Sequence, residues 1–112
     1  MKRGEIWLVN LNPSTGSEIK KTRPAVIISS DLVGILPLKI IVPLTDWKDR
    51  YSAASWMVRF EPDKGNGLKK VSAADALQIR SVSEKRLVKK VGFLTSIQVN
   101  QIVQAVMNVL QK

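Results

Sequence analysis

The chain has 112 residues, the length of one compact domain, and is long enough to bury a core without metal ions or disulfides. Hydrophobic residues make up 45% of the sequence and charged residues 24%, as in ordinary globular proteins. The 18 lysine and arginine residues outnumber the 9 aspartate and glutamate residues, which gives a formal net charge of +9. This excess predicts an anionic partner, with nucleic acid the first candidate and an acidic protein segment the second.

Two missing residue types restrict the chemistry, because the sequence contains neither cysteine nor histidine. Without cysteine there are no disulfides, thiol nucleophiles or zinc-thiolate sites, and nothing points to an oxidising compartment. Without histidine, any acid-base catalysis must use arginine, threonine, serine, lysine, tyrosine or a carboxylate. No apolar run has the length of a signal sequence or a membrane span, so we expect a soluble, cytoplasmic protein with no membrane partner.

Short apolar segments in the first two thirds of the chain have the composition of β-strands. Residues 5–11 (EIWLVNL) precede a cluster of turn formers, and residues 24–30 (PAVIISS) begin with a proline, which the first residue of a strand tolerates. Residues 38–44 and 56–60 follow, and residues 68–73 return after a turn signal rich in Pro, Asp, Gly and Asn. Because no helical pattern separates the first four segments, we expect an antiparallel sheet curled into a small barrel.

The end of the chain has a helical pattern. Thr95 and Gln98 have the spacing of a capping box. Apolar side chains then recur at helical spacing, at Val99, Ile102, Val103, Val106 and Leu110. This predicts an amphipathic helix over residues 95–111, preceded by a short helical turn over residues 83–87 and a strand over residues 88–93.

Four strings occur in a fixed order along the chain: GEIWLVNLNP, GSEIKKTRPAVIIS, IVPLT and GLKKVSAADALQIRSVSEKRL. In order and spacing they resemble the MazF/PemK-like (Kid-like) toxins of bacterial toxin-antitoxin systems. The resemblance covers nearly the whole chain and implies a single toxin domain over residues 1–112. It also implies an SH3-like antiparallel β-barrel with a C-terminal helix, in agreement with the elements predicted above.

The resemblance further implies a homodimeric endoribonuclease that cleaves single-stranded RNA at selected sequences, leaving 2′,3′-cyclic phosphate and 5′-hydroxyl ends. A cognate antitoxin with an acidic, disordered segment is the implied protein partner, and the positive charge suits it. No metal or other cofactor is expected, because the sequence has no carboxylate cluster at ligand spacing.

Carried over by position, the catalytic pair is Arg23, before a proline, and Thr45, after a Pro-Leu pair. When a ribose 2′-hydroxyl attacks the adjacent phosphate, negative charge builds on the phosphoryl oxygens. The guanidinium of Arg23 matches that charge bidentately, and the hydroxyl of Thr45 can donate to a non-bridging oxygen. Glu18 is the candidate general base, although it can instead pair with Lys20 or Lys21.

Six residues are expected to bind RNA: Ser17, Lys20, Lys21, Thr22, Trp47 and Gln78. The two lysines and Thr22 would follow the backbone, Trp47 would stack on a base, and Gln78 would bind an unstacked base edge. The alternative for the lysines is ordinary surface charge. Further basic residues are expected to enlarge the positive field, namely Lys69, Lys70, Lys85, Arg86, Lys89 and Lys90. The other two tryptophans, Trp7 and Trp56, are expected within strands, in the core or at a dimer contact.

One position departs from the family pattern. Many relatives have an acidic residue directly before the glutamine that matches Gln78, whereas this chain has Leu77, and the nearest carboxylate is Asp75. If that acid transfers a proton or recognises a base, its absence changes the cleavage rate or the target sequence. Two other functions suit the same fold: a CcdB-like toxin that binds and poisons DNA gyrase, and an RNA-binding barrel without catalysis. The arginine-threonine pair favours the nuclease.

Overall fold

The computed structural model describes residues 1–33 and 35–111. The strands are β1 (Glu5–Asn10), β2 (Thr22–Ile27), β3 (Leu38–Asp46), β4 (Met57–Phe60), β5 (Ser72–Asp75), β6 (Arg80–Ser83) and β7 (Leu87–Phe93). Short 3-10 turns are η1 (Asp31–Val33), η2 (Asp49–Ala53), η3 (Ala76–Gln78) and η4 (Glu84–Arg86), and the helix is α1 (Ser96–Leu110). Each strand expected from the sequence is present, and β6 is an additional strand that the sequence pattern did not reveal.

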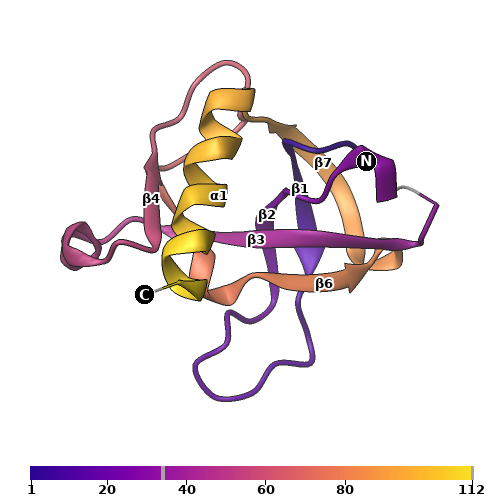
Figure 1. The fold of residues 1–112 in the computed structure, drawn as a ribbon, viewed down its shortest axis with the longest axis horizontal. Helices are drawn as coiled ribbons and strands as arrows, with labels where there is room; N and C mark the ends of the chain where they lie inside the picture. Colours follow the sequence, from indigo (N-terminus) through magenta and orange to yellow (C-terminus); the bar gives the residue numbers. More distant parts are fainter. Residues whose placement is uncertain (34, 112) are drawn as a thin grey trace.

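The strands form one antiparallel sheet in the order β4-β5-β3-β2-β1-β7, and β6 also pairs with β3. The long strand β3 has two partners on one edge, since residues 38–41 pair with β6 and residues 44–46 pair with β5. In Figure 1, α1 crosses in front of β3, and it packs against β4 and η3. The expected mainly-β class with a C-terminal helix is confirmed. Within the described residues β4 does not pair with β7, so the sheet is strongly curled but not closed into a barrel.

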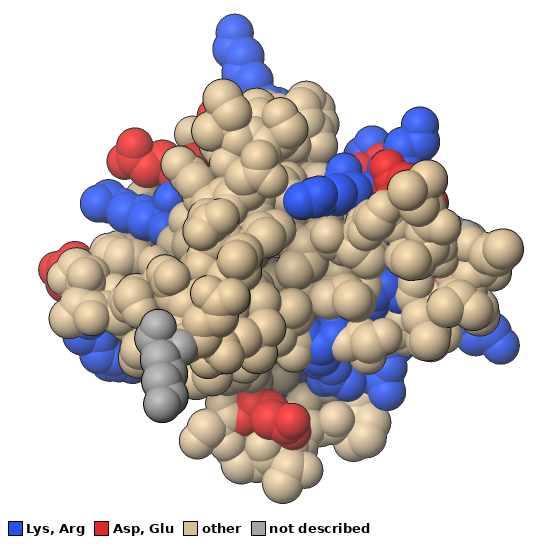
Figure 2. All heavy atoms as spheres, viewed as in Figure 1, with Lys and Arg blue, Asp and Glu red and all other residues tan. Residues whose placement is uncertain are grey.

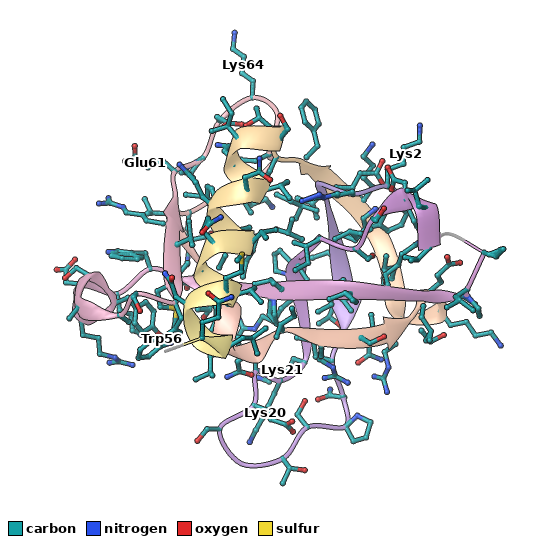
Figure 3. The ribbon with its side chains drawn as sticks, in the orientation of Figure 1. Lys2, Lys20, Lys21, Trp56, Glu61 and Lys64 are labelled. Carbon is teal, nitrogen blue, oxygen red and sulfur yellow. The ribbon has the colours of Figure 1, made fainter. Side chains whose placement is uncertain are left out.

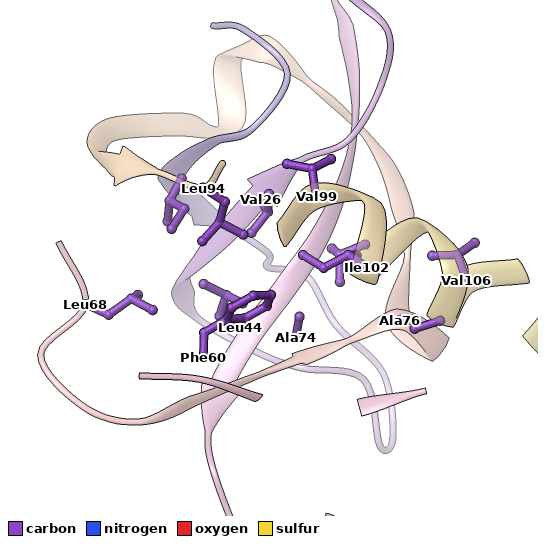
Figure 4. Close-up of a cluster of buried hydrophobic side chains, with 13 residues drawn as sticks. Val26, Leu44, Phe60, Leu68, Ala74, Ala76, Leu94, Val99, Ile102 and Val106 are labelled. Carbon is purple, nitrogen blue, oxygen red and sulfur yellow. The ribbon is translucent and has the colours of Figure 1, made fainter. Parts of the chain in front are cut away.

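The core has two parts, one on each face of β2 and β3. Between the sheet and α1, Val26 packs with helix residues Val99 and Ile102, as Figure 4 shows. On the opposite face, Ala25 and Ile27 pack with residues of β1, β6 and β7. Because alternate side chains of a strand point to opposite faces, the run of apolar residues in β2 fills both parts of the core.

The helix begins as the sequence predicts. The Thr95 hydroxyl accepts a hydrogen bond from the Gln98 amide at 3.2 Å, and the Gln98 side chain accepts one from the Thr95 amide at 2.9 Å. The buried stripe of the helix is one turn shorter than predicted, because Leu110 is 75% exposed. No helix among residues 1–33 and 35–111 combines the length and apolar character needed to cross a bilayer.

The long connection from β4 to β5 is fixed against β7. The Phe93 amide donates to the Gly65 carbonyl at 2.9 Å, and Gly67 has a φ of +66°. A Cβ at Gly67 would collide with the Val91 carbonyl, so only glycine allows this close approach. The residues that follow Gly67 are therefore held beside β7.

Glu5, at the start of β1, is a largely buried carboxylate with several donors. Its Oε1 accepts from the Trp7 indole at 2.9 Å and the Lys2 amide at 3.0 Å, and its Oε2 pairs with the Lys90 Nζ at 3.1 Å. Burial alone would raise the pKa of Glu5, but the hydrogen bonds from Trp7, Lys2, Lys90 and the amino terminus together lower it to about 2. Trp7 itself is half-buried, and its indole nitrogen is hydrogen-bonded to Glu5 at the edge of the core.

A depressed pKa means that ionised Glu5 stabilises the folded state above its ordinary pKa of 4.5, and that this stabilisation disappears as the pH falls toward 2. We expect Glu5→Gln to lower the free energy of unfolding at pH 7 by roughly 2 to 3 kcal/mol and to reduce its loss between pH 4.5 and 2. Urea unfolding at a series of pH values measures both effects.

The control is Glu61→Gln, because the Glu61 carboxylate is 74% exposed and pairs with Arg59 at the surface. Exposed pairs contribute about 0 to 1 kcal/mol, so this variant should differ little from the parent. Parallel acid curves for Glu5→Gln and the parent would contradict the account of Glu5.

Candidate functional site

The backbone brings the two predicted catalytic positions to neighbouring strands. Arg23 lies in β2 and Thr45 in β3, and the register of these strands pairs Ala25 with Pro43 and Val26 with Val42. Continuing that register by two residues sets Arg23 opposite Thr45. Directly opposed residues share a face of an antiparallel pair, with Cβ atoms about 4.5 to 5.5 Å apart. The ladder between the two strands ends at Ala25 and Pro43, so Arg23 and Thr45 lie two residues beyond the last paired positions.

Both side chains are available to a ligand. Arg23 is exposed and Thr45 is half-buried. Within the described residues, neither the guanidinium of Arg23 nor the hydroxyl of Thr45 has a hydrogen-bond or ion-pair partner. A guanidinium without a carboxylate partner is ready to bind a phosphate.

The loop between β1 and β2 carries most of the predicted RNA-binding residues. Lys20 and Lys21 lie on this loop, which projects beyond β6 in Figure 3. Ser17, Lys20, Lys21 and Thr22 are all exposed. The loop is closed at its base, where the Leu11 amide donates to the Lys21 carbonyl at 2.9 Å. The positive charges of Lys20 and Lys21 thus lie on a loop that is anchored to the sheet at both ends.

Glu18 closes a turn within this loop. Its Oε1 accepts from the Thr15 amide at 2.6 Å, and its own amide donates to the Thr15 carbonyl at 3.2 Å. In the described part of the chain Glu18 forms no ion pair, so the expected alternative of a pair with Lys20 or Lys21 is absent. Its Oε2 has no partner there either.

Gln78, in η3, fastens the loop to the sheet. Its Oε1 accepts from the Ile19 amide at 2.8 Å, and its Nε2 donates to the Ser17 carbonyl at 3.0 Å. These bonds give the amide a positioning role on either side of Glu18, and its expected contact with a base edge stays a prediction. One N–H of the amide is left for a ligand.

The predicted residues divide between two cavities. Ser17, Glu18 and Gln78 line a cavity of about 460 Å³ between the loop and the sheet. Arg23 lines a second cavity, of about 560 Å³. Along β3, Pro43 lines the first cavity and Asp46 lines the second. Thr45 shares the strand face of Pro43 and is not among the lining residues of either cavity.

Arg80 was not singled out by the sequence analysis. It lines the first cavity, and its guanidinium donates to the Leu11 carbonyl at 3.2 Å, which fixes the base of the loop. The signal that could have found it is its place close to Gln78 in the sequence, at the start of β6.

Leu77 and Asp75 differ in what they present to a ligand. The Leu77 side chain is 58% exposed and lines the first cavity. Asp75 is buried, and its Oδ1 accepts from the Leu77 amide at 3.1 Å. Burial raises the pKa of Asp75, against the lowering effect of backbone hydrogen bonds from Leu77 and Gln78. Leu77 makes this part of the cavity wall apolar. The neighbouring Asp75 carboxylate is engaged in a hydrogen bond within the protein.

Trp47 is a half-buried ring with one occupied face. The Arg59 guanidinium lies 5.5 Å from the ring centroid, and Tyr51 approaches in an edge-on geometry at 5.8 Å. A base that stacks on Trp47 must use the other face or displace Arg59. Trp56 directly precedes β4 and is 37% exposed, so it is not a core residue, and its alternative role at a dimer contact stays a prediction.

The charges are not spread evenly over the surface. The segment that forms α1 has no charged residue, and in Figure 2 lysine and arginine side chains surround the uncharged face over this helix. In the described chain, no three acidic side chains gather into a group that would hold a metal ion. The site is therefore built from a guanidinium, a hydroxyl, a carboxylate and lysines.

The arrangement of strands and helix defines a class of small β-sheet proteins represented by solved toxins. MazF from Deinococcus radiodurans superposes with a TM-score of 0.79 at 19% identity, over 98% of this chain and 96% of that chain. An endoribonuclease from a mycobacterial species, in complex with its cognate antitoxin, has a TM-score of 0.76 at 19% identity, over 98% and 94% of the two chains. At these identities the likeness establishes the fold.

The family itself follows from the sequence. A family model described as the PemK-like, MazF-like toxin of type II toxin-antitoxin systems matches residues 2–110. The chain is 32% identical over 111 residues to "Endoribonuclease MazF9" of Mycobacterium tuberculosis, which covers 94% of this chain and 92% of that relative. The chain belongs to the PemK-like, MazF-like toxin family.

Gln78→Ala should release the loop from the sheet, because the Ile19 amide and the Ser17 carbonyl lose their partner. A hydrogen bond of this kind contributes about 1 kcal/mol, so exchange of the Ile19 amide with deuterium should become roughly fivefold faster. Hydrogen exchange measured by NMR tests this. Gln101→Ala, at an exposed position of α1, is the matched control, and equal exchange at Ile19 in all three proteins would remove the positioning role from Gln78.

Proposed function

We propose that this protein is an endoribonuclease toxin that cleaves single-stranded RNA without a metal ion or other cofactor. The observation that carries the proposal is the register of β2 and β3, whose continuation by two residues sets Arg23 opposite Thr45, in a chain of this toxin family. The full-length similarity to a relative named as an endoribonuclease supports it.

The reaction proceeds by attack of a ribose 2′-oxygen on the adjacent phosphorus. The new P–O2′ bond forms as the P–O5′ bond breaks, which leaves a 2′,3′-cyclic phosphate and a 5′-hydroxyl. Glu18 takes the proton of the 2′-hydroxyl, and the departing oxygen takes a proton from solvent. Arg23 and Thr45 stabilise the charge that develops on the phosphoryl oxygens.

Substrate binding follows from the exposed loop between β1 and β2. Lys20, Lys21 and Thr22 contact the RNA backbone, and Ser17 and the free N–H of Gln78 face the nucleotides beside Glu18. Trp47 stacks on an unpaired base through its open face. Single-stranded RNA suits this surface because its bases are free to leave the stack and enter the cavities.

The protein partner that we propose is a cognate antitoxin with an acidic segment. One structural neighbour was solved with its cognate antitoxin, and the net charge of +9 on this chain favours a negatively charged partner. Such a segment would neutralise the toxin by covering the basic surface that the RNA uses.

Cleavage of a long single-stranded RNA in EDTA tests the nuclease. We expect discrete cuts by the parent protein and losses on the order of 100-fold or more in Arg23→Ala and Thr45→Ala, because each variant lacks one preorganised donor. Thr45→Ser, which keeps the hydroxyl, should retain most of the activity. Arg23→Lys keeps the charge without the planar fork, so it should lie between the parent and the alanine variant.

Arg50→Ala is the control for the loss of a positive charge, since Arg50 is exposed and contacts only the Tyr51 ring among its recorded partners. Equal losses in Arg50→Ala and Arg23→Ala would remove the catalytic role of Arg23. RNA binding without cutting would favour a non-catalytic RNA-binding protein. Inhibition of DNA gyrase without cutting would favour the gyrase-binding alternative.

We also propose that the protein forms a homodimer, through the apolar surface that follows β2. Six large apolar side chains are exposed there: Leu32, Val33, Ile35, Leu36, Leu38 and Ile40. Leu32 is 94% exposed and Ile35 is 88% exposed, and exposed apolar groups in such density are typical of interaction surfaces.

Light scattering after size-exclusion chromatography should give a mass of about two chains for the parent. The double substitution Leu32→Ser with Ile35→Ser should shift the protein toward the monomer, since it removes the two most exposed apolar side chains of that surface. Ile97→Ser is the control, because Ile97 is 72% exposed but lies on α1. A parent that is monomeric at every concentration would contradict the dimer, and dissociation by Ile97→Ser alone would assign the interface to α1.

A further inference from the structure

The second cavity holds a group of lysines that the reaction described above does not use. We call it the lysine pocket; its lining residues include Leu8, Arg23, Asp46, Leu68, Lys69, Lys70, Lys89, Lys90 and Val91. Its volume of about 560 Å³ lies within the usual range for ligand sites, about 300 to 1,000 Å³.

The floor of the lysine pocket is set by the sheet. Leu8 of β1 is paired with Pro24 of β2 on one side and with Lys89 of β7 on the other. These three residues form a row across three strands and share one face of the sheet. The apolar side chain of Leu8 therefore lies between β2, which carries Arg23, and β7, which carries Lys89.

The rim of the pocket comes from the connection between β4 and β5. That connection is held against β7 at Gly67, where a side chain would collide with the Val91 carbonyl. Lys69 and Lys70 follow directly, and together with Lys89 and Lys90 they line the same cavity. Two lysine pairs that are distant in the sequence are thus brought together by a backbone contact that tolerates only glycine.

The pocket has more positive charge than its acidic neighbours neutralise. Lys70 lies 4.0 Å from the Asp46 carboxylate, and Lys90 lies 3.1 Å from Glu5. Arg23, Lys69 and Lys89 have no acidic partner among residues 1–33 and 35–111. An anion that enters the pocket can be bound by these three cations without breaking an ion pair.

We infer that the lysine pocket binds an RNA nucleotide next to the cleaved bond, with its phosphate on Lys69 and Lys89 and its sugar or base on the Leu8–Leu68 floor. This inference rests on the proposed function, because Arg23 belongs both to the reaction centre and to the pocket wall. A phosphodiester chain held by Arg23 continues into the pocket, and its alternating phosphates and apolar rings match a basic rim over an apolar floor. An acidic peptide would use the rim alone.

Salt-dependent binding of a fully 2′-O-methylated RNA tests the pocket without cleavage, since this RNA lacks the attacking hydroxyl. For single strands, log K falls with log salt by about 0.7 for each phosphate contact. The double substitution Lys69→Gln with Lys89→Gln should therefore make the slope shallower by about 1.4 and weaken binding about tenfold at moderate salt. Fluorescence anisotropy from 50 to 300 mM NaCl measures both quantities.

The matched control is Lys2→Gln with Lys64→Gln, which removes the same charge from exposed lysines outside the pocket. This control should keep the slope of the parent, and thermal unfolding should show that both double variants are folded. An equal change of slope in the two double variants, or no change in either, would overturn the inference. Loss of binding to an acidic peptide with RNA binding intact would overturn it in favour of a peptide site.

Cleavage of unmodified RNA separates this inference from the proposed function. Binding with the expected salt slopes but no cutting by the parent would contradict the nuclease and leave the lysine pocket in place as an RNA site. Normal cutting with an unchanged KM in the pocket variant would contradict the pocket and leave the nuclease. The expected result is a raised KM, about tenfold, with a smaller change in kcat, because the pocket contacts lie outside the reacting atoms.

Discussion

The register between β2 and β3 is the constraint on which the site depends. Both strands are buried on both faces, with Val26 in one part of the core and Ala25 and Ile27 in the other. A slip of one residue would turn the side chains of each strand toward the opposite part of the core, so packing fixes the register strongly. The same register sets Arg23 opposite Thr45 at the exposed end of the pair. The site proposed for the reaction is thus an extension of the core, and its geometry follows from the packing of buried residues.

Catalytic groups that come from loops need a second constraint, and Gln78 supplies it here. Its amide binds backbone groups on each side of Glu18, so a long polar loop has a fixed attachment to the sheet. Hydrogen bonds to backbone atoms hold the course of a loop whatever its side chains are. The loop can therefore carry exposed lysines for substrate while the carboxylate remains near the cavity.

Charge and apolar surface are separated on this molecule. The helix α1 carries no charge and covers one part of the core. The apolar surface after β2 lies on the segment between β2 and β3 and on the first residues of β3. The cations of the lysine pocket come from β2, from β7 and from the connection between β4 and β5. This separation gives one small domain a basic surface and an apolar surface at the same time.

The sequence by itself determined the class of fold and the kinds of chemistry available. Alternating and β-branched segments fixed most strands, Thr95 with Gln98 fixed the start of the helix, and the lack of histidine left arginine, threonine and carboxylates for catalysis. These features are local, because they depend on neighbours within a few residues. The resemblance in order and spacing selected Arg23 and Thr45.

Only the tertiary structure decided how distant segments meet. It paired β6 with β3, joined the Gln78 amide to the loop, and brought Lys69 and Lys89 to one cavity through the close approach at Gly67. It also left the sheet open between β4 and β7 in the described chain. Pairings of this kind join residues tens of positions apart and are fixed by the packing of the whole core, so no short stretch of sequence contains them.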